Sequence, residues 1–195
     1  MRLTLLLCTP IALSSIFSTT ATAEVVESGA MTMKIKEVIE LAAPVDRAYA
    51  SFLKIGSWWD KEHTFSGDAA NLSLDARPGG CFCEKLPNGG GVLHLTVVFI
   101  APNQRVTLSG ALGPLQTTGV TGALSFSFVP KPSQDQPGSQ VVLVYSVGGY
   151  YPNGLQSIAP NVDEVLSQQM QRLKNLIETG SPANVAAAPA APTNK

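Results

Sequence analysis

The folded part of the chain begins with a stretch in which apolar and polar residues alternate. Its apolar face is formed by Met33, Ile35, Ile39 and Leu41. Alternation with a period of two is typical of a half-buried strand, so we predict a first strand over residues 33–41. Glu37 is the exception on the apolar face. Between Pro44 and Gly56 the apolar positions change to helical spacing, which predicts a short helix after this strand.

The middle of the chain has the pattern of an antiparallel meander. Residues 57–75 follow no regular period. From Gly80 onward, short runs rich in Val, Leu, Phe and Thr are separated by clusters of Gly, Pro and Asn. Such runs predict strands joined by turns. We expect the strands over residues 80–85, 92–100, 105–109, 119–129 and 140–147.

The last regular element is a long amphipathic helix. Its apolar stripe contains Val162, Val165, Leu166, Met170, Leu173, Leu176 and Ile177. Gln169 interrupts the stripe, Asn161 with Glu164 is a candidate N-terminal cap, and Gly180 can end the helix. This order of elements predicts an α+β fold, in which a curved antiparallel sheet wraps around the C-terminal helix. If the sheet curls, a cavity opens between it and the helix.

The termini differ in composition from this central domain. Residues 1–23 have a charged start, an apolar middle and a small-residue end at Ala23, which are the features of a cleaved signal peptide. We therefore expect a periplasmic or secreted protein with no stable membrane span after cleavage. Residues 24–30 are expected to be a disordered leader, residues 31–180 one domain, and residues 181–195 a disordered Ala/Pro tail.

Charge and motifs exclude several classes of function. Loss of Arg2 with the signal peptide leaves 12 basic against 14 acidic residues, a net charge of −2, so we expect no nucleic-acid partner. The sequence contains no Gly-x-Ser-x-Gly elbow, no His-Glu-x-x-His motif and no dinucleotide fingerprint. We expect no cofactor. Catalytic residues stay unassigned, and whether the protein is an enzyme stays open.

Four features together resemble the START-like, or SRPBCC, superfamily with its helix-grip fold. They are the IELAAP segment at residues 39–44, the pair Trp58 and Trp59, the RPGGCF segment at residues 77–82, and the closing helix. Within the superfamily the chain resembles exported members of the branch that is activator of heat-shock-protein ATPase-like or polyketide cyclase-like. The resemblance covers almost all of the folded part.

The resemblance implies a hydrophobic cavity that binds lipids, polyketides or similar apolar molecules. Our first hypothesis is a carrier or sensor of such a molecule, as a monomer or homodimer. The alternatives are a cyclase-, dehydratase- or hydrolase-type enzyme that uses the same cavity, and a protein-interaction module with an exposed apolar patch near Trp58 and Trp59 or near residues 112–115.

Six residues are candidates for the cavity wall: Trp58, Trp59, His94, Tyr145, Glu37 and Cys83. The tryptophans either form its mouth or pack in the core. His94 lies in a strand with two apolar faces, so it either meets the cavity or is a satisfied core histidine. Glu37 and Tyr145 either orient a ligand or make internal hydrogen bonds. His63 lies in a polar segment, and we expect a solvated loop histidine there rather than a general base.

Cys81 and Cys83 are the only cysteines that remain after signal cleavage. In a regular strand their Cβ atoms would be roughly 6.6 Å apart, whereas a disulfide needs about 3.8 Å, so a bridge requires a bulge. Together with His63 and His94 they form a ligand set that zinc accepts, but Cys-x-Cys in a strand lacks the usual spacing. We expect thiols and no metal.

Overall fold

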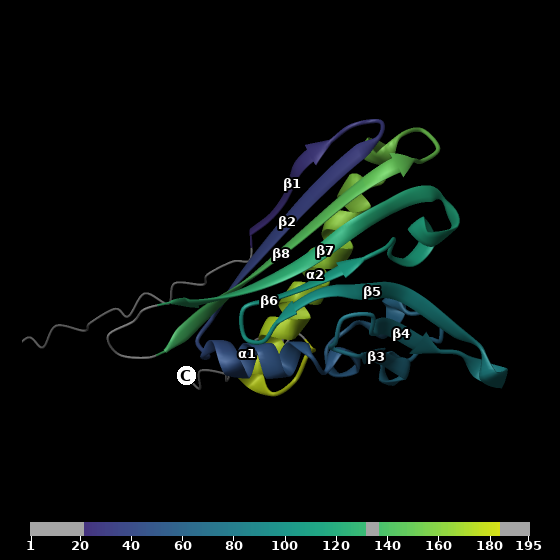
Figure 1. Ribbon diagram of the computed structural model, residues 1–195. Coiled ribbons are helices and arrows are strands. Elements are labelled where there is room, and N and C mark those ends of the chain that lie inside the picture. The colour runs from purple at the N-terminus through teal and green to yellow at the C-terminus, as the bar shows by residue number, and fades with distance from the viewer. Residues whose placement is uncertain (1–21, 132–136, 184–195) are drawn as a thin grey trace, which may run out of the picture.

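The computed structural model describes residues 22–131 and 137–183, and it shows an α+β protein (Figure 1). One antiparallel sheet of eight strands curves around a long helix. The strands are β1 (Thr22–Ser28), β2 (Thr32–Leu41), β3 (Leu72–Leu74), β4 (Cys81–Lys85), β5 (Gly91–Ala101), β6 (Arg105–Ser109), β7 (Gly119–Lys131) and β8 (Gly138–Tyr150). The predicted fold class is confirmed.

The order of the strands brings the two ends of the domain together. Across the sheet the order is β1-β2-β8-β7-β6-β5-β4-β3. Strands β4 to β8 form a meander, while β2 pairs with β8, so that Ile35 lies opposite Tyr145. The alternating burial of β2 follows from this position, because one of its faces covers the core and the other meets solvent.

The helix α2 (Ala159–Thr179) crosses the concave side of the sheet (Figure 1). Its buried positions are Ala159, Leu166, Gln169, Met170, Leu173 and Ile177. The helix ends at Gly180, whose φ of 81° lies in the left-handed region that glycine adopts without strain. None of the helices in the described ranges is long and apolar enough to cross a membrane.

The shorter helix α1 (Val45–Phe52) closes one end of the sheet. Phe52 lies 4.6 Å from Phe126 and 5.4 Å from Phe128, measured between ring centroids. Trp58 follows in the next turn, is fully buried, and donates a hydrogen bond from Nε1 to the carbonyl of Phe52 at 3.0 Å. Burying side chains of this size stabilises the fold by about 1.5–3 kcal/mol each. This aromatic cluster fixes where the following loop leaves the core.

The connections contain six short 3₁₀ helices. They are η1 (Ile55–Ser57), η2 (Lys61–His63), η3 (Ala69–Asn71), η4 (Pro87–Gly89), η5 (Gly113–Thr117) and η6 (Leu155–Ser157). The helices η1, η2 and η3, together with β3, lie in or at the edge of residues 57–75, where the sequence showed no regular spacing of apolar residues. An element of three residues is too short to produce such a spacing.

Two expectations for the ends of elements were wrong. Part of the expected disordered leader belongs to β1, because the edge of β2 offers backbone groups with which it pairs, for example Val25 with Ile35. The helix α2 begins before Asn161, with Pro160 in its first turn, so Asn161 is not its cap. Residues 1–21, most of the expected signal peptide, and 184–195, most of the expected tail, lie outside the described residues.

Candidate functional site

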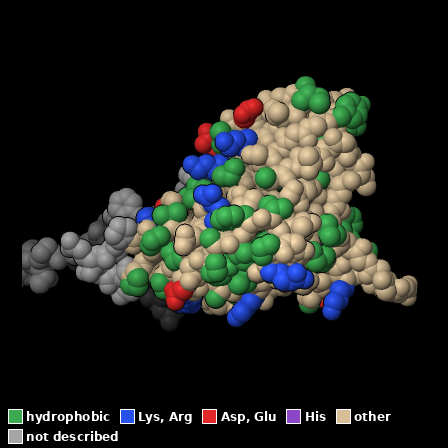
Figure 2. Space-filling view, viewed as in Figure 1, with side chains coloured by type: hydrophobic (Ala, Val, Ile, Leu, Met, Phe, Trp, Pro, Cys, Tyr) green, Lys and Arg blue, Asp and Glu red, His purple; other side chains and the backbone are tan. Residues whose placement is uncertain are grey.

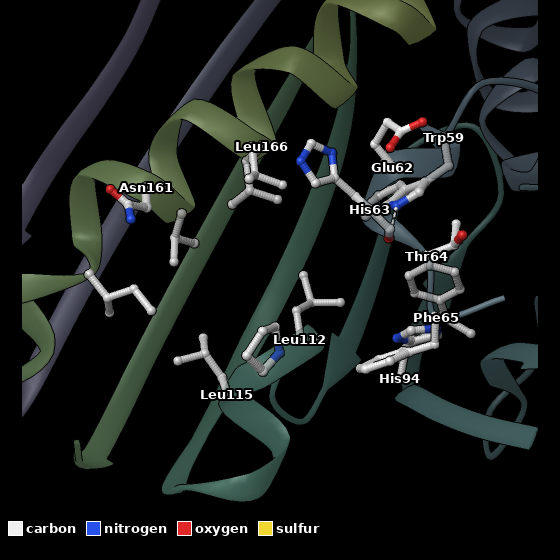
Figure 3. Close-up of a pocket in the computed structure, with 16 residues that line it drawn as sticks. Trp59, Glu62, His63, Thr64, Phe65, His94, Leu112, Leu115, Asn161 and Leu166 are labelled. Carbon is white, nitrogen blue, oxygen red and sulfur yellow. Dashed lines mark hydrogen bonds between the residues drawn. The ribbon is translucent and has the colours of Figure 1, made fainter. Parts of the chain in front are cut away.

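A cavity of about 420 Å³ lies between α2 and the sheet (Figure 3). Four parts of the chain meet around it: the segment that contains η2, the strands β4 and β5, the loop that contains η5, and the first turns of α2. The lining residues are Trp59, Glu62, His63, Thr64, Phe65, Phe82, His94, Leu112, Gly113, Pro114, Leu115, Ile158, Asn161, Val162, Val165 and Leu166. Most of this wall is apolar, and no lysine or arginine contributes to it.

The apolar wall is built from one helix face and one loop. Val162, Val165 and Leu166 come from the same side of α2 because Val165 and Leu166 follow Val162 by three and four residues. Opposite them, the η5 loop is held by two side chains outside the cavity wall. Tyr145 Oη accepts a hydrogen bond from the backbone N–H of Leu112 at 3.0 Å, and Gln116 Nε2 donates to the carbonyl of Leu93 at 2.7 Å.

His94 enters the cavity from β5 and is paired with Glu84 of β4. The distance between His94 Nε2 and Glu84 Oε2 is 2.9 Å. Two aromatic rings stack on the imidazole, Phe82 at 4.7 Å and Phe65 at 5.9 Å between centroids. These contacts fix the plane of the ring. Only 5 % of His94 is exposed, so its orientation is set by the protein and not by solvent.

Glu84 is buried as a carboxylate. Burial alone would raise its pKa, but hydrogen bonds from Ser66, Phe65 and His94 outweigh burial and lower the pKa of Glu84 below its usual value. The backbone N–H of Phe65 donates to Oε2 at 3.1 Å, and that of Ser66 donates to Oε1. The pKa of His94 is lowered by burial, although the Glu84 carboxylate acts in the opposite direction. A neutral imidazole beside a carboxylate is a typical proton acceptor.

His63 reaches the cavity from η2 and is held by the helix α2. The distance between His63 Nδ1 and Gln169 Nε2 is 2.9 Å, and Gln169 Oε1 accepts from the backbone N–H of Asp60 at 2.7 Å. Trp59 donates from Nε1 to the carbonyl of His63 at 3.1 Å. His63 is half-buried in this loop rather than fully solvated, because Gln169 lies within α2 and brings the loop onto the helix.

The structure brings two of the six candidate residues to the cavity wall, Trp59 and His94. Trp58 packs behind Trp59, with ring centroids 5.5 Å apart. Tyr145 is buried behind the η5 loop, and burial raises its pKa to about 12. Glu37 lies between β2 and α2, beyond the lining residues. Contact of any of these residues with a ligand stays a prediction.

Cys83 also lies outside the lining, and the expectation of thiols was wrong. Cys81 and Cys83 form a disulfide with their Cα atoms 5.4 Å apart. The register between β4 and β5 shifts between Phe82 and Cys83, because His94 is an extra, unpaired residue on β5 at this point. Among the described residues, no group of three or more His, Cys, Asp or Glu side chains is arranged to hold a metal ion.

The surfaces expected for a protein-interaction module are largely buried. Trp58, Trp59 and Leu115 are 0 %, 6 % and 2 % exposed. On the face that Figure 2 shows, hydrophobic side chains lie in separate clusters, some beside lysine and arginine side chains and some, at the top, away from them. Trp58, Trp59 and Leu115 themselves are therefore not part of an exposed apolar patch, whereas Phe65 is 56 % exposed.

Sequence reasoning missed Glu84 and Gln169. Glu84 is two residues from Phe82 in a predicted strand, so the period of two already placed it on the same buried face. Gln169 had a signal as well, because it interrupts an apolar stripe. In both cases the partner, a loop backbone or a distant histidine, is not visible in the local pattern.

No family model matches the sequence, and no curated protein matches it either. Solved structures do resemble it. EF2215 from Enterococcus faecalis is 14% identical, with a TM-score of 0.53, over 85% of this chain and 82% of that one. CalU16 from Micromonospora echinospora is 13% identical, with a TM-score of 0.52, over 85% of this chain and 88% of that one. DynU16, from the dynemicin biosynthetic locus, is 15% identical, with a TM-score of 0.50, over 76% of this chain and 48% of that one.

These similarities establish the fold. They do not establish a function, because identities this low do not carry one. This is a helix-grip fold. The sheet grips α2, as the resemblance to the START-like superfamily implied, and the cavity lies where helix-grip architecture leaves space between sheet and helix.

Proposed function

We propose that the protein binds a small hydrophobic molecule in this cavity, as a carrier or a sensor. The observation that carries the proposal is the mainly apolar space of about 420 Å³ between α2 and the sheet. Small-molecule sites usually measure about 300–1,000 Å³ and combine an apolar wall with a few polar groups. Burial of ligand surface would supply the affinity, at about 25 cal/mol per Å² of apolar area.

Two further points support this proposal. DynU16 belongs to a biosynthetic locus, so a protein of similar fold is associated with small organic molecules. The amino-terminal residues favour export, and we propose that binding takes place in the periplasm or outside the cell. A polyketide-like or lipid-like compound is the ligand class that fits both points.

The first test is binding of a neutral apolar fluorophore, N-phenyl-1-naphthylamine, to the purified protein. Trp59 lines the cavity, so binding should change tryptophan fluorescence as well as that of the dye. In Val165→Phe the added ring fills the space, and we expect affinity to fall at least tenfold. Gln168→Phe is the matched control, because position 168 lies on the exposed side of the same helix.

Native mass spectrometry of gently purified protein complements this test. Extra mass that disappears on denaturation would identify a captured ligand. If the dye binds the wild type and Val165→Phe equally, the cavity is not the binding site and the proposal fails.

The second candidate function is an enzyme of cyclase, dehydratase or hydrolase type. It is favoured by one observation: His94, with its Glu84 partner, and His63 line the same cavity. Deuterium exchange at the α-carbon of 2-tetralone, an apolar enolisable ketone, distinguishes the two functions. If the protein accelerates exchange above the rate in buffer, and His94→Phe abolishes this acceleration, proton-transfer catalysis is supported. If the ketone binds without accelerated exchange, the carrier or sensor function is favoured.

A further inference from the structure

The two histidines of the cavity are held in opposite hydrogen-bonding roles. Figure 3 shows them entering from separate elements, His63 below α2 and His94 beside Phe65. Each ring has one nitrogen bonded to a protein group, and the identity of that group decides which atom carries the hydrogen. The other nitrogen is available to a ligand.

For His94 the deciding group is the Glu84 carboxylate. Its two oxygens accept from the backbone N–H groups of Phe65 and Ser66, which can only donate. A carboxylate in turn only accepts. His94 Nε2, 2.9 Å away, must therefore carry its hydrogen. The neutral ring then has a lone pair on Nδ1, which has no hydrogen-bonding partner among the described residues.

For His63 the deciding group is the Gln169 amide. The backbone N–H of Asp60 donates to Gln169 Oε1 at 2.7 Å, which fixes the orientation of the amide. Its NH₂ group then faces His63 Nδ1 at 2.9 Å, and that nitrogen must accept. The hydrogen of the neutral ring consequently lies on Nε2, a donor with no partner in the part of the chain that the structure describes.

The remaining charges favour a neutral ligand. Among the described residues, no lysine or arginine lines the cavity, and Glu62 is the one carboxylic acid in its wall. Glu62 is exposed and forms an ion pair with Lys61 at 3.7 Å. A fatty-acid carboxylate or a phosphate would therefore find no cation in this wall, and transferring it from water into apolar surroundings would be unfavourable.

We propose that the cavity selects neutral apolar molecules with a hydroxyl group, which donates to His94 Nδ1, and an acceptor oxygen, which receives the hydrogen of His63 Nε2. This inference rests on the proposed binding function and narrows its ligand class. Hydroxylated ring compounds that also contain a ketone or ether fit this description, and free fatty acids do not. A buried hydrogen bond of this kind distinguishes ligands because an unpaired polar group in the wall is unfavourable.

The first experiment needs no variant. The chain contains two histidines, so protein with ¹⁵N-labelled histidine gives two ring systems in a long-range ¹H–¹⁵N spectrum. At neutral pH we expect both rings to carry hydrogen on Nε2 and none on Nδ1. A hydrogen on Nδ1 of His94, or of His63, would overturn the assignment of roles.

The second experiment uses ligands that share one frame. We expect 2-naphthol to bind about tenfold more tightly than 2-methoxynaphthalene, which lacks the donor, since tenfold corresponds to about one hydrogen bond. A ketone at the far end, as in 6-hydroxy-2-acetonaphthone, should strengthen binding further, and 2-naphthoate should bind most weakly. Calorimetry measures all four.

Variants separate the two contacts. His94→Phe keeps a ring between Phe65 and Phe82 and leaves Glu84 with its backbone donors, so the protein should fold and lose only the preference for the hydroxyl. His63→Phe should lose the gain from the ketone and keep the preference for the hydroxyl. If all four compounds bind equally, the cavity binds apolar molecules but this inference fails. If none binds, the proposed function fails with it.

Discussion

Gln169 joins the long helix to the loop that carries His63. Its amide is buried and bonded at both ends, to the Asp60 backbone and to the imidazole. A buried amide satisfied in this way specifies one loop conformation, because any other would leave polar groups without partners. The geometry of the cavity wall near His63 therefore depends on this one side chain.

We predict that Gln169→Leu lowers the free energy of unfolding by about 1–3 kcal/mol, the usual effect of leaving buried hydrogen-bonding groups unpaired. Gln168→Leu, a neighbouring substitution on the exposed side of α2, should change it by less than about 0.5 kcal/mol. Urea denaturation followed by tryptophan fluorescence measures both. Equal effects of the two substitutions would contradict the structural role of Gln169.

Single residues show the limit of what the sequence can predict. The apolar stripe of α2 and the strand that holds His94 follow from local periodicity. The partners of Gln169 are 106 and 109 residues away in the chain, so no local pattern could reveal them. The contact of His63 with α2 was not predicted for this reason: its neighbours in sequence are polar, whereas its neighbours in space include the buried side chain of Gln169.

At the scale of elements, the interface between β2 and α2 contains a buried acid. Glu37 is fully buried and lies beside Asp163 and Ser167 of α2. Burial, and then the nearby charge of Asp163, raise the pKa of Glu37 to about 8. Burial also raises the pKa of Asp163. Glu37 is consequently protonated at neutral pH.

This interface makes stability depend on pH. Between pH 4.5 and about 8 the folded protein keeps a proton on Glu37 that the unfolded chain releases, so the free energy of unfolding should fall as pH rises through this range. The total fall should be a few kcal/mol at most, since one pKa unit corresponds to about 1.4 kcal/mol. Chemical denaturation at several pH values measures it.

In Glu37→Gln this slope should become clearly smaller, because a neutral amide replaces the acid, and burial of Asp163 accounts for what remains. Glu40→Gln is the matched control, since Glu40 lies on the same strand but on its outer face. A slope that persists undiminished in Glu37→Gln would show that another group causes it.

Predicting elements from the sequence worked where an element buries a face of its own. The strand expected over residues 105–109 coincides with β6, and β5, β7 and β8 extend only one to three residues beyond the predicted ends. Prediction from the sequence failed for β1, which has little apolar surface and is ordered by pairing with β2. Edge strands of this kind depend on backbone hydrogen bonds, which leave no periodic signature.

At the scale of the whole molecule, stability comes from a continuous core and not from the covalent link. The core cluster extends from Met33 to Ile177 and includes residues of the sheet, α1 and α2. The Cys81–Cys83 disulfide closes a loop between residues only two apart. A loop this short removes little conformational freedom from the unfolded chain.

We therefore predict that the double variant Cys81→Ser, Cys83→Ser folds and loses less than about 2 kcal/mol of stability. Thermal unfolding with and without reductant, compared between wild type and variant, tests this. A chain that fails to fold without the disulfide would show that the covalent link between Cys81 and Cys83, and not the core alone, controls assembly.

The pairing of β2 with β8 also has a consequence for how the protein reaches its final state. Strands β2 and β8 pair although they come from opposite ends of the domain, and α2, which supplies one wall of the cavity, is its last element. Contacts between distant parts of a chain form slowly because a long loop must close first. The cavity wall therefore cannot be complete in a partly synthesised chain, because α2 is the last element of the domain to be made.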